Sequence, residues 1–314
     1  MTIAVTGGTG FVGRHVMQYL AASGRAVRAL ARDPARLPAS ANIVPVRGDI
    51  NDSGAAATLC QGATTVLHIA GAISGSAEQM MRVNGEGTAA LLNAADQAGV
   101  GRFVHVSSLA AREPDLSPYG RSKARSEEEV NTATRTIQTL IIRPPAVYGE
   151  GDTATLPLLK ALLANTAVLP GHKASRFSLI HGEDLARILV AAIDSEVVGL
   201  REVDDGHGAY TWTDVAHVMR GLAGRPQRVT YLPRAAAMMV GHAGDVLAKL
   251  TRRPMMVSAG KMHELYHHDW VSRPPGWPRP NPVTLGEGMH RTLSHAMAHG
   301  LLPRLPLADR SPTP

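Results

Sequence analysis

The chain has 314 residues, of which 44% are hydrophobic and 18% are charged. This balance is ordinary for a globular protein with a sizeable core, and no apolar run is long enough to cross a bilayer. The net charge is +6 and Cys60 is the only cysteine, so no disulfide can form within the chain.

These features also bear on partners and compartment. No basic run alternates with aromatic residues, which are only 4% of the chain, and this argues against nucleic acid as a partner. The first expected strand begins too early for a signal peptide to precede it. We therefore expect a cytoplasmic protein.

The first element is a short apolar strand over residues 3–6, which runs into three glycines spaced three residues apart and then into an amphipathic helix over 11–23. The first glycine permits a tight turn, the second lets the backbone approach a pyrophosphate, and the third lets the helix pack closely. The N-terminus of the helix offers amide groups and a positive dipole end to phosphates. The residues expected to hold the dinucleotide here are Gly7, Gly10, Phe11, Val12 and Gly13.

Strands and helices alternate through the first half of the chain. The expected strands span residues 3–6, 26–31, 43–47, 65–69, 103–107 and 139–143. The expected helices span residues 11–23, 53–60, 78–98 and 119–131. Several strands are continuous apolar runs, as in a parallel sheet covered on both faces. We therefore predict an α/β fold, with a Rossmann doubly wound parallel sheet over residues 1–150.

The second half differs in composition, because prolines and glycines become frequent after residue 143. We predict a smaller C-terminal α/β substrate lobe over residues 151–314, with a disordered tail from about 308. The segment 176–193 is expected to form a strand and a helix that return to the first domain.

An apolar stretch at 235–250 contains Met238, Met239 and Val240 and is followed by Arg252 and Arg253. Three interpretations stay open: core, a lid over an apolar substrate, or a face resting on a membrane. Peripheral membrane contact is thus one possibility, and the chain is expected to be a monomer or a homodimer.

The end of the second strand selects the cofactor. An acid at this position accepts hydrogen bonds from the adenosine ribose of NAD, whereas an arginine accommodates the 2′-phosphate of NADP. Here Ala31 stands at the acid position and Arg32 follows, which favours NADP(H) over NAD(H). Asp33 could serve as the ribose acid in a shifted register. Asp49 and Ile50, after the third strand, are expected to line the adenine; Asp49 could equally be a turn or helix cap.

Three further residues indicate catalysis. Ser108 follows the fifth strand, and Tyr119 and Lys123 are four residues apart, so that they share one helix face. A phenol is a poor acid–base catalyst at neutral pH, and an adjacent ammonium lowers its pKa. Ser108 would hold a carbonyl or alcohol oxygen beside Tyr119. This set is suited to proton transfer coupled to hydride transfer.

The chain resembles the extended short-chain dehydrogenase/reductase family, also called the NAD-dependent epimerase/dehydratase family. The resemblance rests on residues 6–13, 67–71, 83–88, 106–108, 119–123, 143–149 and 177–184, with 276–278 and 285–288 as closing elements. It implies that Ser108, Tyr119 and Lys123 are catalytic and that Lys123 also binds the nicotinamide ribose. It further implies that Asn84 orients structure around the cofactor, its alternative role being a helix cap. The remaining cofactor residues that it implies are Ala70, Gly71, Pro144 and Val147.

Departures from the family pattern narrow the reaction. The family's dehydratases carry Thr-Asp-Glu where this chain has 107–109 as Ser-Ser-Leu, and the Asn of many sugar-nucleotide epimerases is missing after Arg143. The pattern is more similar to the dihydroflavonol reductase and 3β-hydroxysteroid dehydrogenase groups. We therefore predict a reductase or dehydrogenase that interconverts a ketone and a secondary alcohol on an apolar small molecule.

Two alternatives remain. One is an epimerase of a sugar derivative. The other follows from the short segment between Ser108 and Tyr119, which resembles the accessory nucleotide-binding subunit of respiratory complex I and implies a non-catalytic NADPH-binding scaffold.

One motif points elsewhere. His263-Glu264-Leu265-Tyr266-His267 matches the zinc-protease pattern His-Glu-x-x-His. It lies where the family has an ordinary helix, so we predict no metal site.

Overall fold

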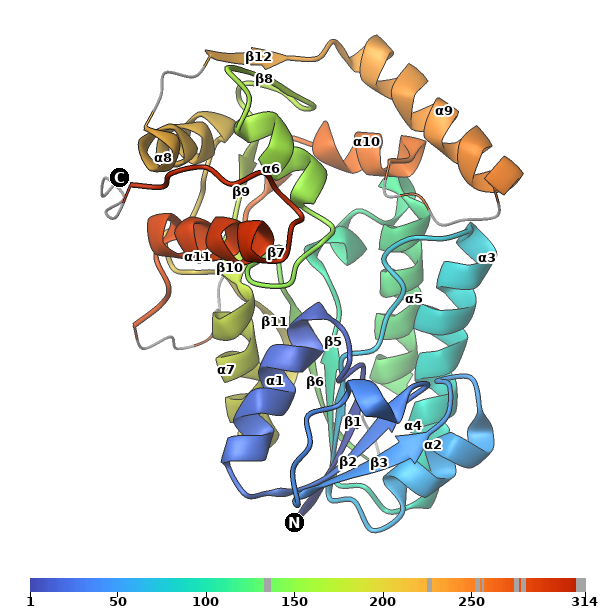
Figure 1. Cartoon of the computed structure of the whole chain (residues 1–314). Coiled ribbons are helices and arrows are strands. Elements are labelled where there is room, and N and C mark those ends of the chain that lie inside the picture. The colour runs from blue at the N-terminus through green and yellow to red at the C-terminus, as the bar shows by residue number, and fades with distance from the viewer. Residues whose placement is uncertain are drawn as a thin grey trace. The chain divides into compact units, whose positions relative to one another are not determined.

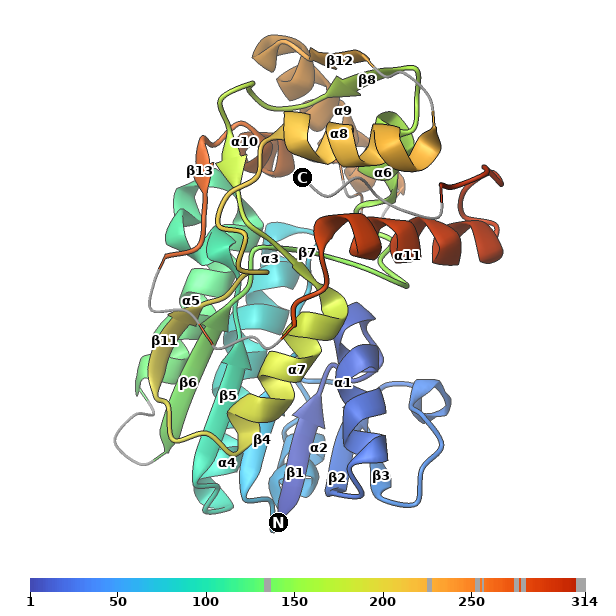
Figure 2. The same ribbon diagram turned by 90° about the vertical axis from the view of Figure 1, so that its left-hand side faces the viewer.

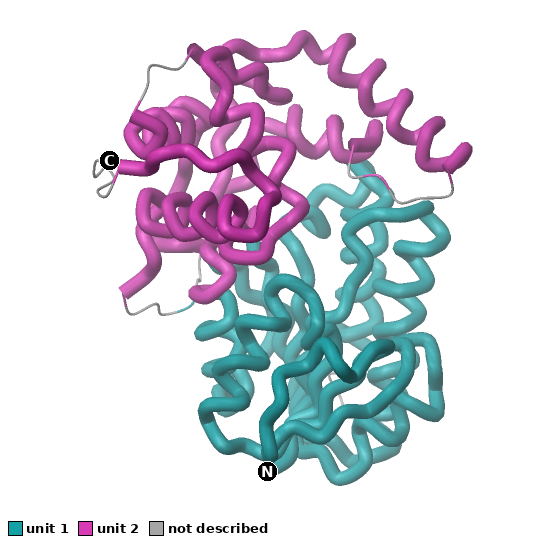
Figure 3. The backbone as a smooth tube through the Cα atoms, viewed as in Figure 1, with its two compact units in different colours: residues 1–144, 185–203, 274–277 teal, residues 145–184, 204–273, 278–314 magenta. Residues whose placement is uncertain are grey.

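The computed structural model describes residues 1–132, 137–224, 228–251, 255, 257–273, 277 and 281–308. The chain forms two compact units (Figure 3). Unit 1 comprises residues 1–144, 185–203 and 274–277, and unit 2 comprises residues 145–184, 204–273 and 278–314. The first break thus follows Pro144, where the sequence placed it near 150, and the chain returns to unit 1 at Leu185, where the sequence placed the return at 176.

Strand pairing explains the later return. The short strands β9 (Arg176–Phe177) and β10 (Leu179–His181) pair with β13 (Asp269–Trp270) and β7 (Ala146–Tyr148). All four strands belong to unit 2.

Unit 1 is built on a seven-stranded sheet in the order β11-β6-β5-β4-β1-β2-β3, in which every pair is parallel. The strands are β1 (Thr2–Thr6), β2 (Ala26–Ala31), β3 (Ile43–Arg47), β4 (Thr65–His68), β5 (Arg102–Val106), β6 (Gln138–Arg143) and β11 (Gly199–Glu202). The predicted doubly wound Rossmann sheet is confirmed. The edge strand β11 was not predicted.

Helices cover both faces of this sheet (Figures 1 and 2). On one face lie α1 (Phe11–Ala22) and α7 (Gly182–Ile193), and on the other α2 (Ser53–Cys60), α4 (Gly87–Gln97) and α5 (Pro118–Thr132). The core between the sheet and α2 and α4 includes Leu59, Leu91 and Phe103, all fully buried. Single helical turns η1 (Pro34–Arg36), η3 (Leu109–Arg112) and η4 (Pro114–Leu116) complete the unit.

The single helix expected over 78–98 is interrupted. The structure has α3 (Ala77–Met80), a π-helical segment η2 (Met81–Glu86) and then α4. Such π-helical turns are uncommon and frequent at functional sites. The interruption turns Asn84 to the inside, where it is buried.

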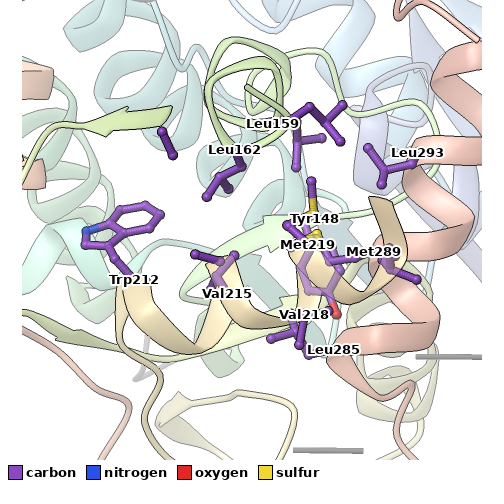
Figure 4. Close-up of a cluster of buried hydrophobic side chains, with 14 of the residues drawn as sticks. Tyr148, Leu159, Leu162, Trp212, Val215, Val218, Met219, Leu285, Met289 and Leu293 are labelled. Atoms are coloured by element: carbon purple, nitrogen blue, oxygen red, sulfur yellow. The ribbon is translucent and has the colours of Figure 1, made fainter. Parts of the chain in front are cut away.

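The described residues of unit 2 form three two-stranded sheets, which pair β10 with β7, β12 with β8 and β13 with β9. Its further elements are α6 (Leu156–Leu162), β8 (Thr166–Leu169), α8 (Trp212–Ala223), β12 (Arg228–Tyr231), α9 (Arg234–Thr251), α10 (Ala259–Leu265) and α11 (Leu285–Ala298). Figure 4 shows its core, where Leu159, Trp212, Met219 and Leu293 pack with Tyr148 of β7.

Some predicted features fall outside the described residues: Arg252, Arg253, Gly276, Pro278 and the tail from 309 onward. Among the helices that the structure describes, none combines the length and the apolar character needed to cross a membrane.

Candidate cofactor and catalytic site

The carboxyl ends of parallel strands meet at one edge of a sheet, and dinucleotides bind where the strand order reverses. In unit 1 that reversal lies between β1 and β4. Gly7 follows β1 with a φ of +76°, which favours glycine. A Cβ on Gly7 would lie 2.5 Å from the amide nitrogen of Ala70, which follows β4. The turn after β1 and the loop after β4 are therefore in tight contact at the switch point.

The other two glycines of the loop differ in their surroundings. A Cβ on Gly13 would lie 2.0 Å from the carbonyl oxygen of Gly7, so any side chain there would clash with the turn. The nearest atom to a Cβ on Gly10 is the same oxygen, at 3.3 Å. Gly13 is thus required by packing within the protein, whereas a Cβ on Gly10 would make a single, tight contact with the turn.

The start of α1 fits an anionic ligand. Gly10 caps this helix without a side-chain hydrogen bond, and its first turn, which includes Phe11 and Val12, carries no acidic residue. Helix N-termini present amide donors and a positive dipole end, which favour phosphate. The loop and helix start therefore fit the pyrophosphate of a dinucleotide.

The residues after β2 and β3 have partners of their own. Asp33 caps η1, since its Oδ1 accepts from the amide of Ala35 at 3.2 Å. Asp49 accepts from the amide of Asn51 at 3.1 Å, as a turn residue does. The Arg32 side chain is 83% exposed, and its Nε lies 4.0 Å from Asp49 Oδ2. Among the residues that the structure describes, Arg32 thus makes only a weak, solvent-exposed ion pair with Asp49.

Ile50, which the sequence analysis placed beside the adenine, is a core residue. Its side chain is buried, and a Cβ on Gly87 would lie 3.0 Å from Ile50 Cγ1. The structure therefore packs this side chain against the start of α4.

The side chain of Asn84, in η2, links the loop after β4 to helix α5 beside Gly71. Its Oδ1 accepts from the amide of Ala72 at 2.7 Å, and its Nδ2 donates to the carbonyl of Ala72 at 2.9 Å and to Ser122 Oγ at 2.8 Å. A Cβ on Gly71 would lie 3.1 Å from Lys123 Nζ and 3.2 Å from Asn84 Oδ1. Asn84 is thus not a helix cap, and it fixes the loop after β4 to helix α5.

Lys123 is buried and donates from Nζ to the carbonyl oxygen of Val106 at 2.8 Å. Burial lowers the pKa of this ammonium to about 8, while the carboxylate of Glu127 acts in the opposite direction. The imidazoles of His68 and His105 are buried nearby, with ring centroids 5.1 Å apart. Burial and the Lys123 charge lower the pKa of His68 to about 3, and that of His105 is also well lowered.

Ser107 and Ser108 have different surroundings. Ser107 is buried and donates a hydrogen bond to the carboxylate of Glu127. Ser108 is half-buried, and its Oγ accepts from the amide of Ala110 at 3.2 Å, so that it caps η3. The hydroxyl of Ser107 is therefore buried and hydrogen-bonded within the protein, whereas Ser108 is more exposed to solvent.

Tyr119 lies in the first turn of α5, one turn before Lys123, and is half-buried. Its neighbour Gly120 packs on the segment after Ser108, because a Cβ on Gly120 would lie 2.7 Å from the carbonyl oxygen of Ala110. The start of α5 is therefore held against the chain that follows β5.

The last two predicted cofactor residues lie on either side of the unit boundary. The carbonyl of Pro144 accepts from the amide of Leu109 at 2.9 Å, which places the end of β6 beside the residue after Ser108. Val147 lies on β7 of unit 2, where it pairs with Ile180.

The sequence did not predict a network of mostly buried ion pairs that contacts Ser107 through Glu127. Arg143 donates from Nε and Nη2 to the two oxygens of Glu127 at 2.8 and 2.6 Å. Its Nη1 lies 3.5 Å from Glu202, which also pairs with Arg112 at 3.4 Å. The sequence held part of the information needed to predict this network, since Glu127 stands one turn after Lys123 on the same helix face. Glu202, however, comes from the unpredicted strand β11.

The zinc-like motif has no metal-site geometry. Helix α10 ends at Leu265, so His263 and His267 do not share a helix. Glu264 pairs with Lys261 at 2.9 Å, and the His267 ring packs against Trp270. Within the described ranges, no group of three or more His, Cys, Asp or Glu side chains is placed to hold a metal ion.

Comparison with known proteins places the chain among its relatives. A sequence model of the NAD dependent epimerase/dehydratase family matches residues 3–202. The chain belongs to this family. The match spans the whole central sheet of unit 1, and the resemblance inferred from the sequence motifs is confirmed. The protein is therefore an NAD(P)-dependent enzyme of the extended short-chain dehydrogenase/reductase type.

Three similar proteins show the range of the family. A ceramide reductase of Caulobacter vibrioides (strain NA1000 / CB15N) is 39% identical over 309 residues, which cover 96% of each chain. A 3 beta-hydroxysteroid dehydrogenase/Delta 5-->4-isomerase of Mycobacterium tuberculosis is 32% identical over 219 residues, or 59% of each chain. The structure of MoeE5 with UDP-glucuronic acid and NAD is 26% identical, with a TM-score of 0.61, covering 74% of this chain and 85% of that one.

Proposed function

We propose that this family member is an NADP(H)-dependent reductase that interconverts a ketone and a secondary alcohol on a long-chain lipid of the ceramide class. One observation carries the substrate class: the likeness to a ceramide reductase covers 96% of both chains and so includes unit 2. We assign the cofactor to unit 1 and the lipid to unit 2, and we place the enzyme in the cytoplasm.

The side chains of unit 1 supply the proton chemistry. Tyr119 gives its phenolic proton to the oxygen that becomes the alcohol, and takes it back in the oxidative direction. Ser108 donates a hydrogen bond to the same oxygen. The Lys123 ammonium, held against the Val106 carbonyl, favours the phenolate and binds the nicotinamide ribose. The nicotinamide, when bound, supplies or accepts the hydride.

The end of β2 supports NADP(H). Ala31 offers no carboxylate to the ribose, and the Asp33 carboxylate already caps η1. Arg32 is highly exposed and has only a weak partner in Asp49. An arginine in this position can pair with a 2′-phosphate.

Substitution of the acid–base residue tests the mechanism. We expect Tyr119→Phe to lower kcat by about 10²–10⁴-fold with a keto-ceramide substrate, because general acid–base catalysis contributes about that much. NADPH affinity, measured by fluorescence titration, should change little. Tyr231→Phe is the matched control, since among the described residues its hydroxyl has no hydrogen-bond partner. Unchanged turnover in Tyr119→Phe would contradict the mechanism.

The substrate class is tested separately. Wild-type protein with NADPH should oxidise the cofactor in the presence of the keto-lipid and should not convert UDP-glucuronic acid. Epimerisation of the sugar nucleotide without net cofactor oxidation would show that the likeness to MoeE5 is the better guide.

A further inference from the structure

Helix α9 carries an exposed apolar stripe that the proposed chemistry does not use. Large side chains on this helix are unusually exposed: Met239 is 73% exposed, Val246 56% and Leu250 77%. With Ala243 these residues follow the spacing of one helix face. Val240 and Leu247, also exposed, widen the same stripe.

The opposite side of α9 packs against other residues of unit 2. Figure 1 shows α10 beside α9. A Cβ on Gly241 would lie 2.8 Å from the Cα of Ala259, and one on Gly244 would lie 2.1 Å from the carbonyl oxygen of Val257. The two glycines therefore let α9 pack closely on the start of α10. This packing fixes which face of α9 points to solvent.

The charged side chains of α9 that are exposed to solvent are of one sign. The exposed titratable side chains of the helix are Arg234, His242 and Lys249; of these, His242 and Lys249 flank the apolar stripe, and Arg234 is the first residue of the helix. The only acidic residue of the helix, Asp245, is turned to α10, where its Oδ2 accepts from the amide of Ala259 at 3.0 Å. Asp245 is half-buried, and the exposed ionisable side chains of α9 are all basic.

We propose that α9 docks this enzyme on an anionic phospholipid surface. A helix that lies in the membrane interface has this make-up: an apolar face that enters the acyl boundary and basic residues that reach the headgroups. At about 1.5 Å per residue its 18 residues give about 27 Å of contact along the bilayer plane. The inference rests on the proposed function in one respect, since a lipid substrate resides in that surface.

The choice of a membrane over a protein partner follows from the side chains. Interface centres between proteins are enriched in aromatic residues, and α9 has none. Its stripe is aliphatic, with one methionine, and its flank complements negative headgroups. A second copy of this chain would bring the same basic flank and no complementary acid on α9.

Vesicle sedimentation tests the proposal with the full chain. We expect binding to vesicles of phosphatidylglycerol and phosphatidylcholine at 1:3, and much weaker binding to pure phosphatidylcholine. Val246→Glu with Leu250→Glu should lower binding at least tenfold. Arg234→Gln with Lys249→Gln should lower it by about fivefold per charge on anionic vesicles only. The control is Val44→Glu with Val198→Glu, which adds the same charge at residues 56% and 50% exposed elsewhere.

Activity separates this proposal from the proposed function. The Val246→Glu/Leu250→Glu variant should reduce a short-chain, water-soluble keto-lipid at the wild-type rate and lose activity on substrate embedded in vesicles. Wild-type protein that reduces the soluble substrate but does not bind vesicles would overturn the docking proposal alone. Vesicle binding without lipid reduction would overturn the proposed function alone. A dimer in sedimentation velocity that the two glutamates dissociate would show that a second copy covers α9.

Discussion

Lys123 donates from Nζ to the carbonyl oxygen of Val106 over 2.8 Å, which fastens helix α5 to the last residue of strand β5. The carbonyl satisfies the ammonium as an acceptor but does not neutralise it. Burial outweighs the charge of Glu127 and lowers the pKa to about 8. The charged form of Lys123 therefore costs the fold stability at neutral pH, as is common for groups at functional sites.

The first prediction concerns that cost. The fall from 10.5 to about 8 corresponds to at most about 3 kcal/mol at pH 7, and loss of the hydrogen bond offsets about 1 kcal/mol of it. We expect Lys123→Met to lose activity yet to be as stable as wild type, or more stable, at pH 7. Urea unfolding measures the difference.

The lowered pKa of Lys123 also fixes the direction in which the free energy of unfolding changes with pH. Between pH 8 and 10.5 the unfolded chain holds a proton that the folded protein has lost, so wild-type stability rises with pH in this window. Lys123→Met should lack that rise. Lys261→Met is a control at a lysine whose side chain is 45% exposed, and it should retain the wild-type slope. Parallel curves for wild type and Lys123→Met would contradict the prediction.

A second prediction concerns Glu127, a buried carboxylate that accepts hydrogen bonds from Ser107 and Arg143. Glu127→Gln removes the charge that Arg143 holds with two hydrogen bonds and leaves a mostly buried guanidinium with a weaker partner in Glu202. Breaking such a pair costs about 3–5 kcal/mol. The loss of negative charge also lowers the pKa of Lys123 further, so the alkaline limb of the kcat/KM profile should move to lower pH.

The neighbouring residue provides the control. Glu128 is 65% exposed and pairs with Arg125 on the surface, so Glu128→Gln should change stability by less than about 0.5 kcal/mol and leave the pH profile in place. If Glu127→Gln lowers stability but keeps the wild-type profile, its role is structural only.

The site was predictable where it depends on local sequence. The glycine loop, the strand that precedes it and the Tyr119–Lys123 spacing are all short-range patterns. The structure places the glycine loop at the switch point of the sheet and Tyr119 and Lys123 on one helix, α5. The partners of Glu127 were not predictable in the same way. Glu202 lies on β11, which follows the predicted return segment 176–193. The four residues of β11, Gly-Leu-Arg-Glu, contain no apolar run that would predict a strand.

The sequence of unit 2 also contains helix-capping residues that predict where α8 begins and ends. Helix α8 begins with a capping box formed by Thr211 and Asp214 and ends at Gly224, whose φ is +60°. Both are recognisable in sequence. The π-helical segment at Asn84, in unit 1, has no such sequence signal; the partner of its side chain is Ala72, in the loop after β4.

A third prediction separates two glycines of one loop. Gly13→Ala places a methyl 2.0 Å from the carbonyl oxygen of Gly7, so the turn must move and the free energy of unfolding should fall by about 1–3 kcal/mol. Gly10→Ala meets only one atom, at 3.3 Å, so its stability should fall by less than that of Gly13→Ala. Its NADPH affinity should nevertheless fall at least tenfold, because the methyl enters the space of the pyrophosphate. Urea unfolding and fluorescence titration of both variants check this, and equal NADPH binding by Gly10→Ala and wild type would refute the placement.

The last prediction concerns Arg32 and Asp33, the two residues after β2 that could each select between NADPH and NADH. A charge-assisted pair with phosphate is worth about 1.5–3 kcal/mol, and the 83% exposure of Arg32 places it at the lower end. Arg32→Ala should therefore weaken NADPH about tenfold, leave NADH unchanged, and lose its effect at high salt. Asp33→Ala should cost about 1 kcal/mol of stability through its cap on η1 and change neither affinity. Titrations of both variants with both cofactors decide the matter: a selective loss of NADH binding in Asp33→Ala would make Asp33 the ribose acid and the enzyme NAD-dependent.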